Sequence, residues 1–274
     1  MATPRFEFGK NWRDYVEKHF SPEKVETSKG HILAFMQRPD FAGLRFLDIG
    51  CGSGLHSLAA YEAGAHEVVS FDYDANSVEA TRQLHRHAGA PANWRVLQGS
   101  VLDGDFLASL GEFDIVYSWG VLHHTGDQWT AIRNAASAVK RGGELYVALY
   151  TSDAFVDPTP EFWLDVKRRY VSSGWPTRLG LVAWYIWRFE FGSRPTPRKF
   201  ARWREKVRQY KTQRGMSYFH DVKDWLGGYP MEFSSIADVK RFADETLGFE
   251  LKNIATGHAN TEYLFARPKG ANGR

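Results

Sequence analysis

The feature that most restricts the fold of this chain is an alternation of short apolar segments with helical segments between residues 44 and 150. The apolar segments are continuous, as is typical of strands buried on both faces of a parallel sheet. Helices between such strands imply right-handed crossovers that cover both faces of the sheet. We therefore expect a doubly wound α/β fold with strands at 44–50, 67–72, 94–99, 113–119 and 144–150, and helices at 57–64, 76–89 and 127–140.

The end of the chain is expected to complete this sheet. Residues 249–256 and 261–268 have the pattern of an antiparallel hairpin. The sheet then has seven strands and is mostly parallel, with an antiparallel last strand. A helix over 234–248 should precede the hairpin, with Ser235 as its N-cap. For the helix over 76–89 the expected N-cap is Asn76.

The overall composition excludes several classes of protein. A hydrophobic content of 43% with 24% charged residues is that of a globular protein. The single Cys excludes an internal disulfide framework and a Cys-rich metal module. The first twenty residues lack the apolar run of a secretory signal. The longest apolar stretch, Leu179 to Ile186, is far shorter than the roughly 20 residues of a spanning helix. We expect a cytoplasmic protein, with contact to a membrane surface left open.

Residues 151–233 differ in composition from the alternating region. Between residues 161 and 214 there are 14 Lys or Arg and 4 Asp or Glu, a local charge of +10 in a chain whose net charge is +3. Six of the 10 Trp lie between residues 155 and 233. We interpret this region as a basic, aromatic helical insertion that forms a lid over the substrate. The expected domains are thus an N-terminal helical cap (1–40), the core (41–150), the insertion (151–233), and a C-terminal helix and hairpin (234–274).

A glycine-rich loop at the end of the first expected strand is the main candidate for ligand binding. The sequence Asp48-Ile-Gly-Cys-Gly-Ser-Gly54 allows a tight turn, and a helix start supplies unpaired N–H donors. Asp72 ends the second strand, 22 residues after Gly50, where nucleotide-binding folds place a carboxylate against ribose hydroxyls. The dinucleotide fingerprint is G-x-G-x-x-G, and this loop departs from it because its third glycine comes too early.

From about residue 40 to 150 the sequence resembles the class I S-adenosylmethionine-dependent methyltransferases, which have a Rossmann-like fold. Five segments match that family in order: FLDIGCGSG, FDYD, GSVLD, YSWGVLHHT and KRGGELYVALY. The resemblance implies S-adenosyl-L-methionine as cofactor and S-adenosyl-L-homocysteine as product. It also implies that four of these segments contact the cofactor: the glycine loop, FDYD with the ribose-binding acid, GSVLD as the adenine segment, and YSWGVLHHT after strand four. The implied contact residues are Asp48, Gly50, Cys51, Gly52, Gly54, Asp72, Tyr73, Ser100, Val101, Ser118 and Trp119.

The N-terminal sequence FEFGKNWRDYVEKHF resembles a segment that precedes the core in some small-molecule members of the family and folds over the cofactor. Asn11, Trp12 and Tyr15 fall within one helical turn of each other. They form either a lid on the methionine end of the cofactor or part of a peripheral helix that packs on the sheet.

Two segments contain candidate catalytic bases. A sulfonium is already an activated leaving group, so the enzyme must align the acceptor and remove its proton. His123 and His124 follow the fourth strand, at the edge where open α/β sheets bind ligands, but a structural role suits paired His equally well. Residues 215–230, GMSYFHDVKDWLGGYP, resemble a block in bacterial small-molecule or polysaccharide-tailoring methyltransferases. There His220 with Asp221, or Asp224, could act as base and orienter; the alternative is a rigid turn.

These observations predict a methyltransferase that acts on a small molecule, anionic or lipid-linked, at the oxygen of a sugar or phenol. The sequence predicts no metal site, since it shows no compact acidic cluster beyond Asp72 and Asp74. The basic insertion is compatible with a lid for an anionic substrate, an RNA surface, a membrane surface or a solvated helical cover. The alternatives in function are an RNA (tRNA) methyltransferase, an NAD-dependent oxidoreductase and a non-catalytic cofactor-binding module. Nucleic acid is the less favoured partner because the net charge is near neutral, and the sequence leaves the oligomeric state open.

Overall fold

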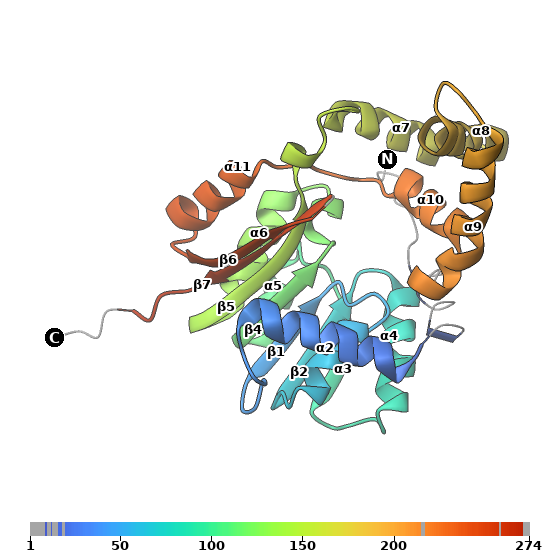
Figure 1. Ribbon diagram of the computed structural model, residues 1–274. Coiled ribbons are helices and arrows are strands. Elements are labelled where there is room, and N and C mark those ends of the chain that lie inside the picture. Colours follow the sequence, from blue (N-terminus) through green and yellow to red (C-terminus); the bar gives the residue numbers. More distant parts are fainter. Residues whose placement is uncertain are drawn as a thin grey trace.

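A seven-stranded sheet organises the computed structural model, which describes Gly9, Trp12, Val16, Glu17 and residues 20–214, 217–257 and 259–270 (Figure 1). The strand order is β3-β2-β1-β4-β5-β7-β6, and β7 alone runs opposite to the other six strands. The expected fold class is therefore confirmed. The strands are β1 (Arg45–Ile49), β2 (Glu67–Asp72), β3 (Trp94–Gln98), β4 (Phe113–Trp119), β5 (Val139–Tyr150), β6 (Glu250–Thr256) and β7 (Asn260–Ala266).

Helices cover both faces of the sheet because alternate residues of its buried strands point to opposite sides. In β1, for example, Phe46 joins the core cluster on one face, whereas Leu47 joins the cluster on the other. The first face carries α2 (Pro22–Met36), α3 (Leu55–Glu62) and α4 (Ala75–His87). The second face carries α5 (Gly104–Leu110), α6 (Gln128–Ser137) and α11 (Ile236–Arg241), which continues as a π-helical turn (Phe242–Thr246).

Two helix caps test the local sequence predictions. Ser235 caps α11 as expected, because its side chain accepts a hydrogen bond from the backbone N–H of Asp238 at 3.0 Å. The prediction for α4 was wrong. Asp74 is the N-cap of that helix and accepts from the backbone N–H of Asn76 at 2.8 Å, so that Asn76 lies inside the first turn. A carboxylate two residues ahead offers a stronger acceptor to the unpaired N–H groups than the amide does.

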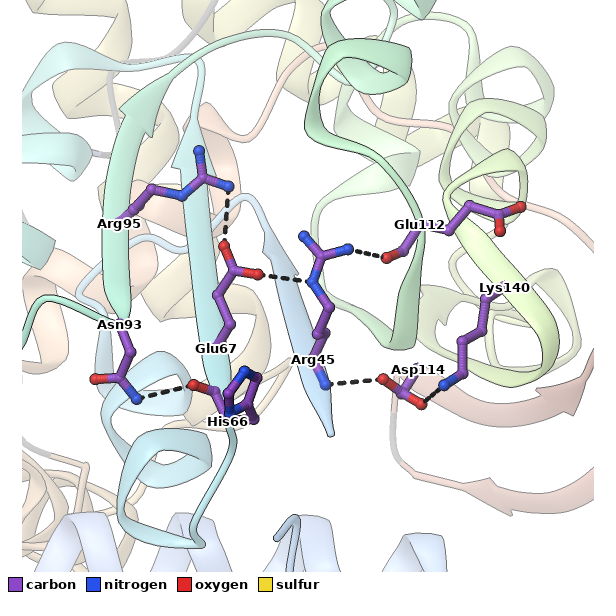
Figure 2. A network of polar contacts seen from close by, with 8 residues as sticks. All are labelled: Arg45, His66, Glu67, Asn93, Arg95, Glu112, Asp114 and Lys140. Atoms are coloured by element: carbon purple, nitrogen blue, oxygen red, sulfur yellow. Dashed lines mark hydrogen bonds and ion pairs between the residues drawn. The ribbon is translucent and has the colours of Figure 1, made fainter. Parts of the chain in front are cut away.

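A network of paired charges closes the amino ends of the strands (Figure 2). Arg45 donates from Nε to a Glu67 oxygen at 2.6 Å, and Arg95 donates to the other Glu67 oxygen at 3.1 Å. Asp114 accepts from the backbone N–H of Arg45 at 2.9 Å and also pairs with Lys140. Each of the two carboxylates is thus held by two donors from neighbouring strands, which ties the first five strands together at this edge.

Residues 151–233 are mostly helical and form an arch of helices at one end of the sheet (Figure 1). Its own core cluster includes Trp163, Tyr170, Val182, Tyr218 and Leu226. No helix in the described part of the chain is both long enough and apolar enough to cross a membrane. The helices are α7 (Pro160–Ser172), α8 (Trp175–Ile186) with a π-helical turn (Trp187–Phe191), α9 (Pro197–Arg214) and α10 (Tyr218–Gly227).

The N-terminal part of the chain divides between two locations. Helix α2 packs on the sheet through Val25, Ile32 and Met36, away from the glycine loop. Gly9 and Trp12 instead lie at that loop: the backbone N–H of Gly9 donates to Asp74 at 2.9 Å, and Trp12 packs against Gly52. Among the described residues of the predicted 1–40 cap, Gly9 and Trp12 therefore lie at the glycine loop, whereas α2 packs on the sheet. Asn11 and Tyr15 lie outside the described residues.

Candidate functional site

The glycine loop turns between β1 and α3 with three residues in the left-handed region. Gly50, Gly52 and Gly54 have φ values of 74°, 55° and 82°, which side chains other than glycine rarely adopt. Space is also restricted. A Cβ on Gly50 would lie 2.4 Å from a methyl group of Val121, and one on Gly54 would lie 2.9 Å from the Cα of Thr81. Both strain and close approach therefore require glycine in this loop.

Asp48 lies beneath the loop, at the end of a buried chain of hydrogen bonds. The Trp94 indole donates to Ser70 at 2.8 Å, Ser70 donates to Ser57 at 2.7 Å, and Ser57 donates to Asp48 at 2.5 Å. Burial raises the pKa of Asp48 to about 7, although the bond from Ser57 opposes this rise. The chain of hydroxyl groups fixes the orientation of Asp48, which supports the loop from inside the core rather than facing the cavity.

Asp72, at the end of β2, holds the loop and faces the cavity. Its two oxygens accept from the backbone N–H groups of Gly52 at 3.0 Å and Asp74 at 2.9 Å. Burial raises the pKa of Asp72 to about 6, and these backbone donors only partly offset the effect. Each carboxylate oxygen has a second lone pair, so Asp72 can still accept hydrogen bonds from the hydroxyl groups of a ligand.

A single cavity of about 680 Å³ joins the glycine loop to the helical insertion. This volume is within the range of small-molecule sites. At one end lie the loop, Asp72 and the residues after β3. At the other lie residues after β4, the last residue of β5, and α10 with the turn that follows it. The described lining residues include no Lys or Arg. They include four acids, namely Asp72, Asp74, Asp221 and Asp224. The cavity therefore favours neutral or positively charged groups.

Most of the described candidate cofactor residues line this cavity. Those that do are Trp12, Gly50, Cys51, Gly52, Asp72, Tyr73, Ser100, Val101 and Trp119. Asp48, Gly54 and Ser118 lie behind the lining. Gly54 begins α3, and Ser118 donates to the backbone oxygen of Ile49 at 3.0 Å. Cys51 is buried and its pKa is raised by burial, which is consistent with a small packed residue rather than a nucleophile.

The two consecutive His residues have different environments. His124 lines the cavity, and its Nδ1 lies 2.7 Å from the backbone oxygen of Pro230, a carbonyl that can only accept. The proton must then be on Nδ1, which leaves Nε2 as an acceptor. Burial lowers the pKa of His124 to about 4, so the ring is neutral near pH 7. His123 is fully buried outside the lining, and its Nδ1 accepts from the backbone N–H of Tyr150 at 3.3 Å. Only His124 is positioned to meet a ligand.

Helix α10 and the turn after it bring further groups to the cavity. Asp221, Asp224 and Tyr229 all line it. The phenol of Tyr210 on α9 donates to Asp221, which links α9 to this wall. The side chain of His220 lies outside the described part of the chain.

Several lining residues were not singled out from the sequence. Tyr150 is the last residue of β5 and lies next to His124, with ring centroids 5.6 Å apart. The rule that ligands bind at the carboxyl ends of parallel strands could have found it. His56 on α3 and Asn260 at the start of β7 also line the cavity, but no local sequence pattern marks them. Among the described residues, no group of three or more His, Cys, Asp or Glu is placed to hold a metal ion.

Comparisons with known proteins agree with this geometry. Residues 46–143 match the family model described as a methyltransferase domain. These residues, less than half of the chain, form a methyltransferase domain. They contain the glycine loop, Asp72 and the adenine segment, which make up most of the cofactor end of the cavity, and also His124 at its other end.

Curated relatives match only part of the chain. A tRNA U34 carboxymethyltransferase from Methylococcus capsulatus is 35% identical over 104 residues, which cover 38% of this chain and 31% of the relative. A ubiquinone biosynthesis O-methyltransferase from Rhizobium rhizogenes is 36% identical over 135 residues, or 47% of this chain and 52% of the relative. The chain therefore spans about half or less of the length of these relatives.

Solved structures share the fold over most of the chain. An O-methyltransferase family protein from Burkholderia thailandensis superposes with a TM-score of 0.55 at 15% identity, covering 90% of this chain and 57% of that protein. The magnesium protoporphyrin IX methyltransferase from Synechocystis, solved with bound S-adenosylhomocysteine, gives a TM-score of 0.52 at 16% identity over 89% of this chain and 83% of that protein. At these identities the likeness concerns the fold alone.

The residues of the methyltransferase domain that line the cavity have the chemistry needed to bind S-adenosylmethionine. Asp72 offers acceptor positions for ribose hydroxyl groups, and the glycine loop allows close approach to the backbone. The acidic lining suits a sulfonium and an ammonium group, and it would oppose the pyrophosphate of a dinucleotide. Asp72, Ser100, Val101, Trp12 and Trp119 are the residues that would hold this cofactor.

Proposed function

We propose that this chain is an S-adenosylmethionine-dependent methyltransferase that methylates a hydroxyl group of a small molecule. The observation that carries the proposal is the single cavity, in which the cofactor end and the wall made by His124, Tyr150 and α10 are continuous. Such a cavity lets a cofactor and an acceptor meet inside one space. The name of the Rhizobium relative, an O-methyltransferase, supports the choice of oxygen.

The chemistry required of the protein is alignment and proton removal. S-adenosylmethionine, when bound, supplies a methyl group on a positively charged sulfur. As the acceptor oxygen forms its bond to the methyl carbon, the carbon–sulfur bond breaks and the hydroxyl proton must leave. His124 is neutral and has Nε2 as its acceptor nitrogen, so it can take a hydrogen bond and then the proton from that hydroxyl. Asp221 and Asp224 in the same lining are the alternative proton acceptors.

The lining also argues against an anionic acceptor. The basic residues of the insertion suggested a lid for an anion, yet no Lys or Arg is among the described residues of the cavity wall. The wall near His124 is built from polar and aromatic side chains, including Trp119, Tyr150 and Tyr229. These features support a neutral phenol or sugar hydroxyl as acceptor.

Methylation of RNA is the second candidate. It is supported by the basic insertion and by the name of the Methylococcus relative, which acts on tRNA. An RNA acceptor would give binding that weakens steeply with salt. Binding of a neutral small-molecule acceptor would change little with salt.

The proposal is tested by screening neutral phenols and sugars, with tRNA in parallel, for release of S-adenosylhomocysteine. We expect turnover with a small hydroxyl compound. His124→Gln should keep S-adenosylhomocysteine binding and lower kcat by about a hundredfold, as is typical for the loss of a general base. His123→Gln is the matched comparison, because its side chain lies outside the lining and should affect stability more than kcat. Cofactor binding without turnover on any acceptor would favour a binding module, and turnover on tRNA alone would favour the second candidate.

A further inference from the structure

The outer face of α8 and the turn after it is an exposed apolar stripe. Trp175, Leu179, Ala183 and Trp187 follow one another at a spacing of four residues, which places them along one side of the helix. Trp175 is 76% exposed, Leu179 is 61% exposed and Trp187 is 56% exposed. We call these four residues the α8 stripe.

The α8 stripe is not part of the core of the insertion. Another side of the same helix supplies that core through Val182, with Tyr185 packed against it. Helix α8 is thus apolar on both its buried side and its exposed side. A helix of this kind is stable in water only with its apolar surface covered, and a continuous exposed patch marks an interaction site.

Unpaired cations follow the stripe in the sequence. Arg194, Arg198, Arg202 and Arg204 are exposed, and none forms an ion pair with a carboxylate within the described residues. In contrast, Lys206 pairs with Glu190. The first part of α9, which carries these arginines, packs on the turn after α8: Lys199 donates to the backbone oxygen of Phe191 at 2.7 Å. The apolar stripe and the arginines therefore belong to adjoining elements, and the cavity uses neither.

We propose that the α8 stripe and the arginines of α9 bind the surface of an anionic lipid bilayer. Trp residues at both ends of an apolar stripe suit the interface between headgroups and acyl chains, and the arginines suit anionic headgroups. Leu179 and Ala183 separate the two Trp rings and cannot stack on bases, so the stripe lacks the series of aromatic platforms that a single-stranded RNA would need, which disfavours RNA. A second copy of the chain is disfavoured because the two basic segments, each of charge +10 over residues 161–214, would repel each other.

Vesicle flotation tests this proposal with the full chain. Vesicles of phosphatidylcholine alone are compared with vesicles that contain equal parts of phosphatidylcholine and phosphatidylglycerol. We expect the wild type to float only with the anionic vesicles. The Trp175→Ser/Leu179→Ser/Trp187→Ser variant should bind them at least about tenfold more weakly. The Arg194→Gln/Arg198→Gln/Arg202→Gln variant should lose roughly a hundredfold in affinity at low salt.

A matched control instead removes three exposed cations that lie outside the insertion. Arg86→Gln/Arg241→Gln/Lys252→Gln lowers the net charge equally but should leave vesicle binding unchanged, because these residues lie away from α8 and are each paired with an acid. S-adenosylhomocysteine binding shows that each variant is folded, and it also separates this proposal from the proposed methyl transfer. If the stripe variant fails to fold, quenching of wild-type Trp fluorescence by brominated acyl chains replaces it, and strong quenching in anionic vesicles is expected.

Three results would overturn the proposal. The first is absence of wild-type binding to anionic vesicles, or unquenched Trp fluorescence. The second is vesicle binding that the stripe variant retains in full. The third is salt-sensitive binding to tRNA, or self-association abolished by the stripe variant, without any vesicle binding; these would assign the surface to RNA or to a second copy of the chain.

Discussion

The two ends of the sheet shift the pKa values of their acidic side chains in opposite directions. At the amino ends of the strands, Glu67 lies between two arginines, which hold its pKa below the usual value although burial opposes them (Figure 2). At the carboxyl ends, burial raises the pKa of Asp72 to about 6 and that of Asp48 to about 7, and backbone or hydroxyl donors only partly offset this. The same strands thus carry satisfied charges at one end and incompletely satisfied charges at the other.

The difference shows at which end of the sheet a ligand can supply hydrogen-bond donors that the carboxylates still lack. A paired carboxylate gains little from a new donor, so the amino edge serves structure alone. A buried carboxylate with spare lone pairs gains from each hydroxyl or cation that approaches it. The raised pKa values therefore mark the carboxyl edge as a binding site, in agreement with the cavity found there.

The largest effect is expected from Gly50→Ala. The new Cβ would lie 2.4 Å from a methyl group of Val121, at a φ of 74°. The loop must then move, and affinity for S-adenosylhomocysteine should fall on the order of a hundredfold, with a loss of about 1–3 kcal/mol of stability. Gly43→Ala at the amino end is the matched control: its φ is similar, at 77°, but no described atom lies within 4 Å of the new Cβ. Its affinity should stay at the wild-type value, as measured by equilibrium dialysis. Equal losses in both variants would show that general destabilisation is responsible.

A smaller effect is expected from Asp72→Asn. The substitution keeps the shape of the side chain but removes the charge that would accept ribose hydroxyl donors. Affinity for S-adenosylhomocysteine should fall by about tenfold to a hundredfold, the range for hydrogen bonds to a charged group. Glu67→Gln makes the same chemical change at the other end of β2 and should leave affinity unaltered. Wild-type affinity in Asp72→Asn would remove Asp72 from the cofactor site.

The two ends should also differ in their dependence on pH. Asp72 has a raised pKa of about 6 in the unliganded chain, and a ligand that donates to its carboxylate selects the ionised form. Affinity for S-adenosylhomocysteine should therefore decline as pH falls through about 6, by at most about tenfold per pH unit. Asp72→Asn should flatten this profile.

In the absence of ligand, Asp72 and Glu67 should make the stability of the fold change with pH in opposite directions. The raised pKa of Asp72 contributes stability at low pH that is lost as pH rises through about 6. The lowered pKa of Glu67 contributes stability at higher pH that is lost as pH falls through its folded-state value, below 4.5. Thermal melts of Asp72→Asn and Glu67→Gln across this range separate the two contributions. Parallel changes in both variants would contradict the contrast between the two edges.

The smallest effect is expected from Arg95→Gln. The side chain of Arg95 is 47% exposed, and Glu67 keeps its bond from Arg45. Stability should fall by less than about 1 kcal/mol, as is usual for exposed ion pairs, and cofactor affinity should not change. A urea melt measures the first quantity. A large loss of affinity would show that the amino edge is coupled to the site.

The fold and the cofactor end could be predicted from the sequence because local patterns determine them. Continuous apolar runs give the parallel strands, and the spacing from Gly50 to Asp72 places the acid at the correct edge. Even here one local prediction was wrong, since Asp74 rather than Asn76 caps α4. Two polar residues that are two positions apart can both cap the helix, and the sequence alone does not choose between them.

The acceptor end could not be predicted in the same way because distant segments build it. The contact between His124 and Pro230 joins residues 106 positions apart, and it is this bond that fixes which ring nitrogen can accept. The charge of the insertion is equally ambiguous in sequence. A segment with charge +10 does not reveal whether its cations face the cavity or the solvent, and the described lining contains none of them.

Calorimetric titration of the wild-type chain with S-adenosylhomocysteine tests the central claim most directly, namely that the carboxyl-edge cavity is an S-adenosylmethionine site completed by its ligand. The titration is repeated near pH 6 in two buffers of different ionisation enthalpy, and then with NAD. We expect one binding site and no heat from NAD. We also expect release of protons on binding, because Asp72 becomes fully ionised. Binding of NAD without binding of S-adenosylhomocysteine, by a chain that melts cooperatively, would contradict it.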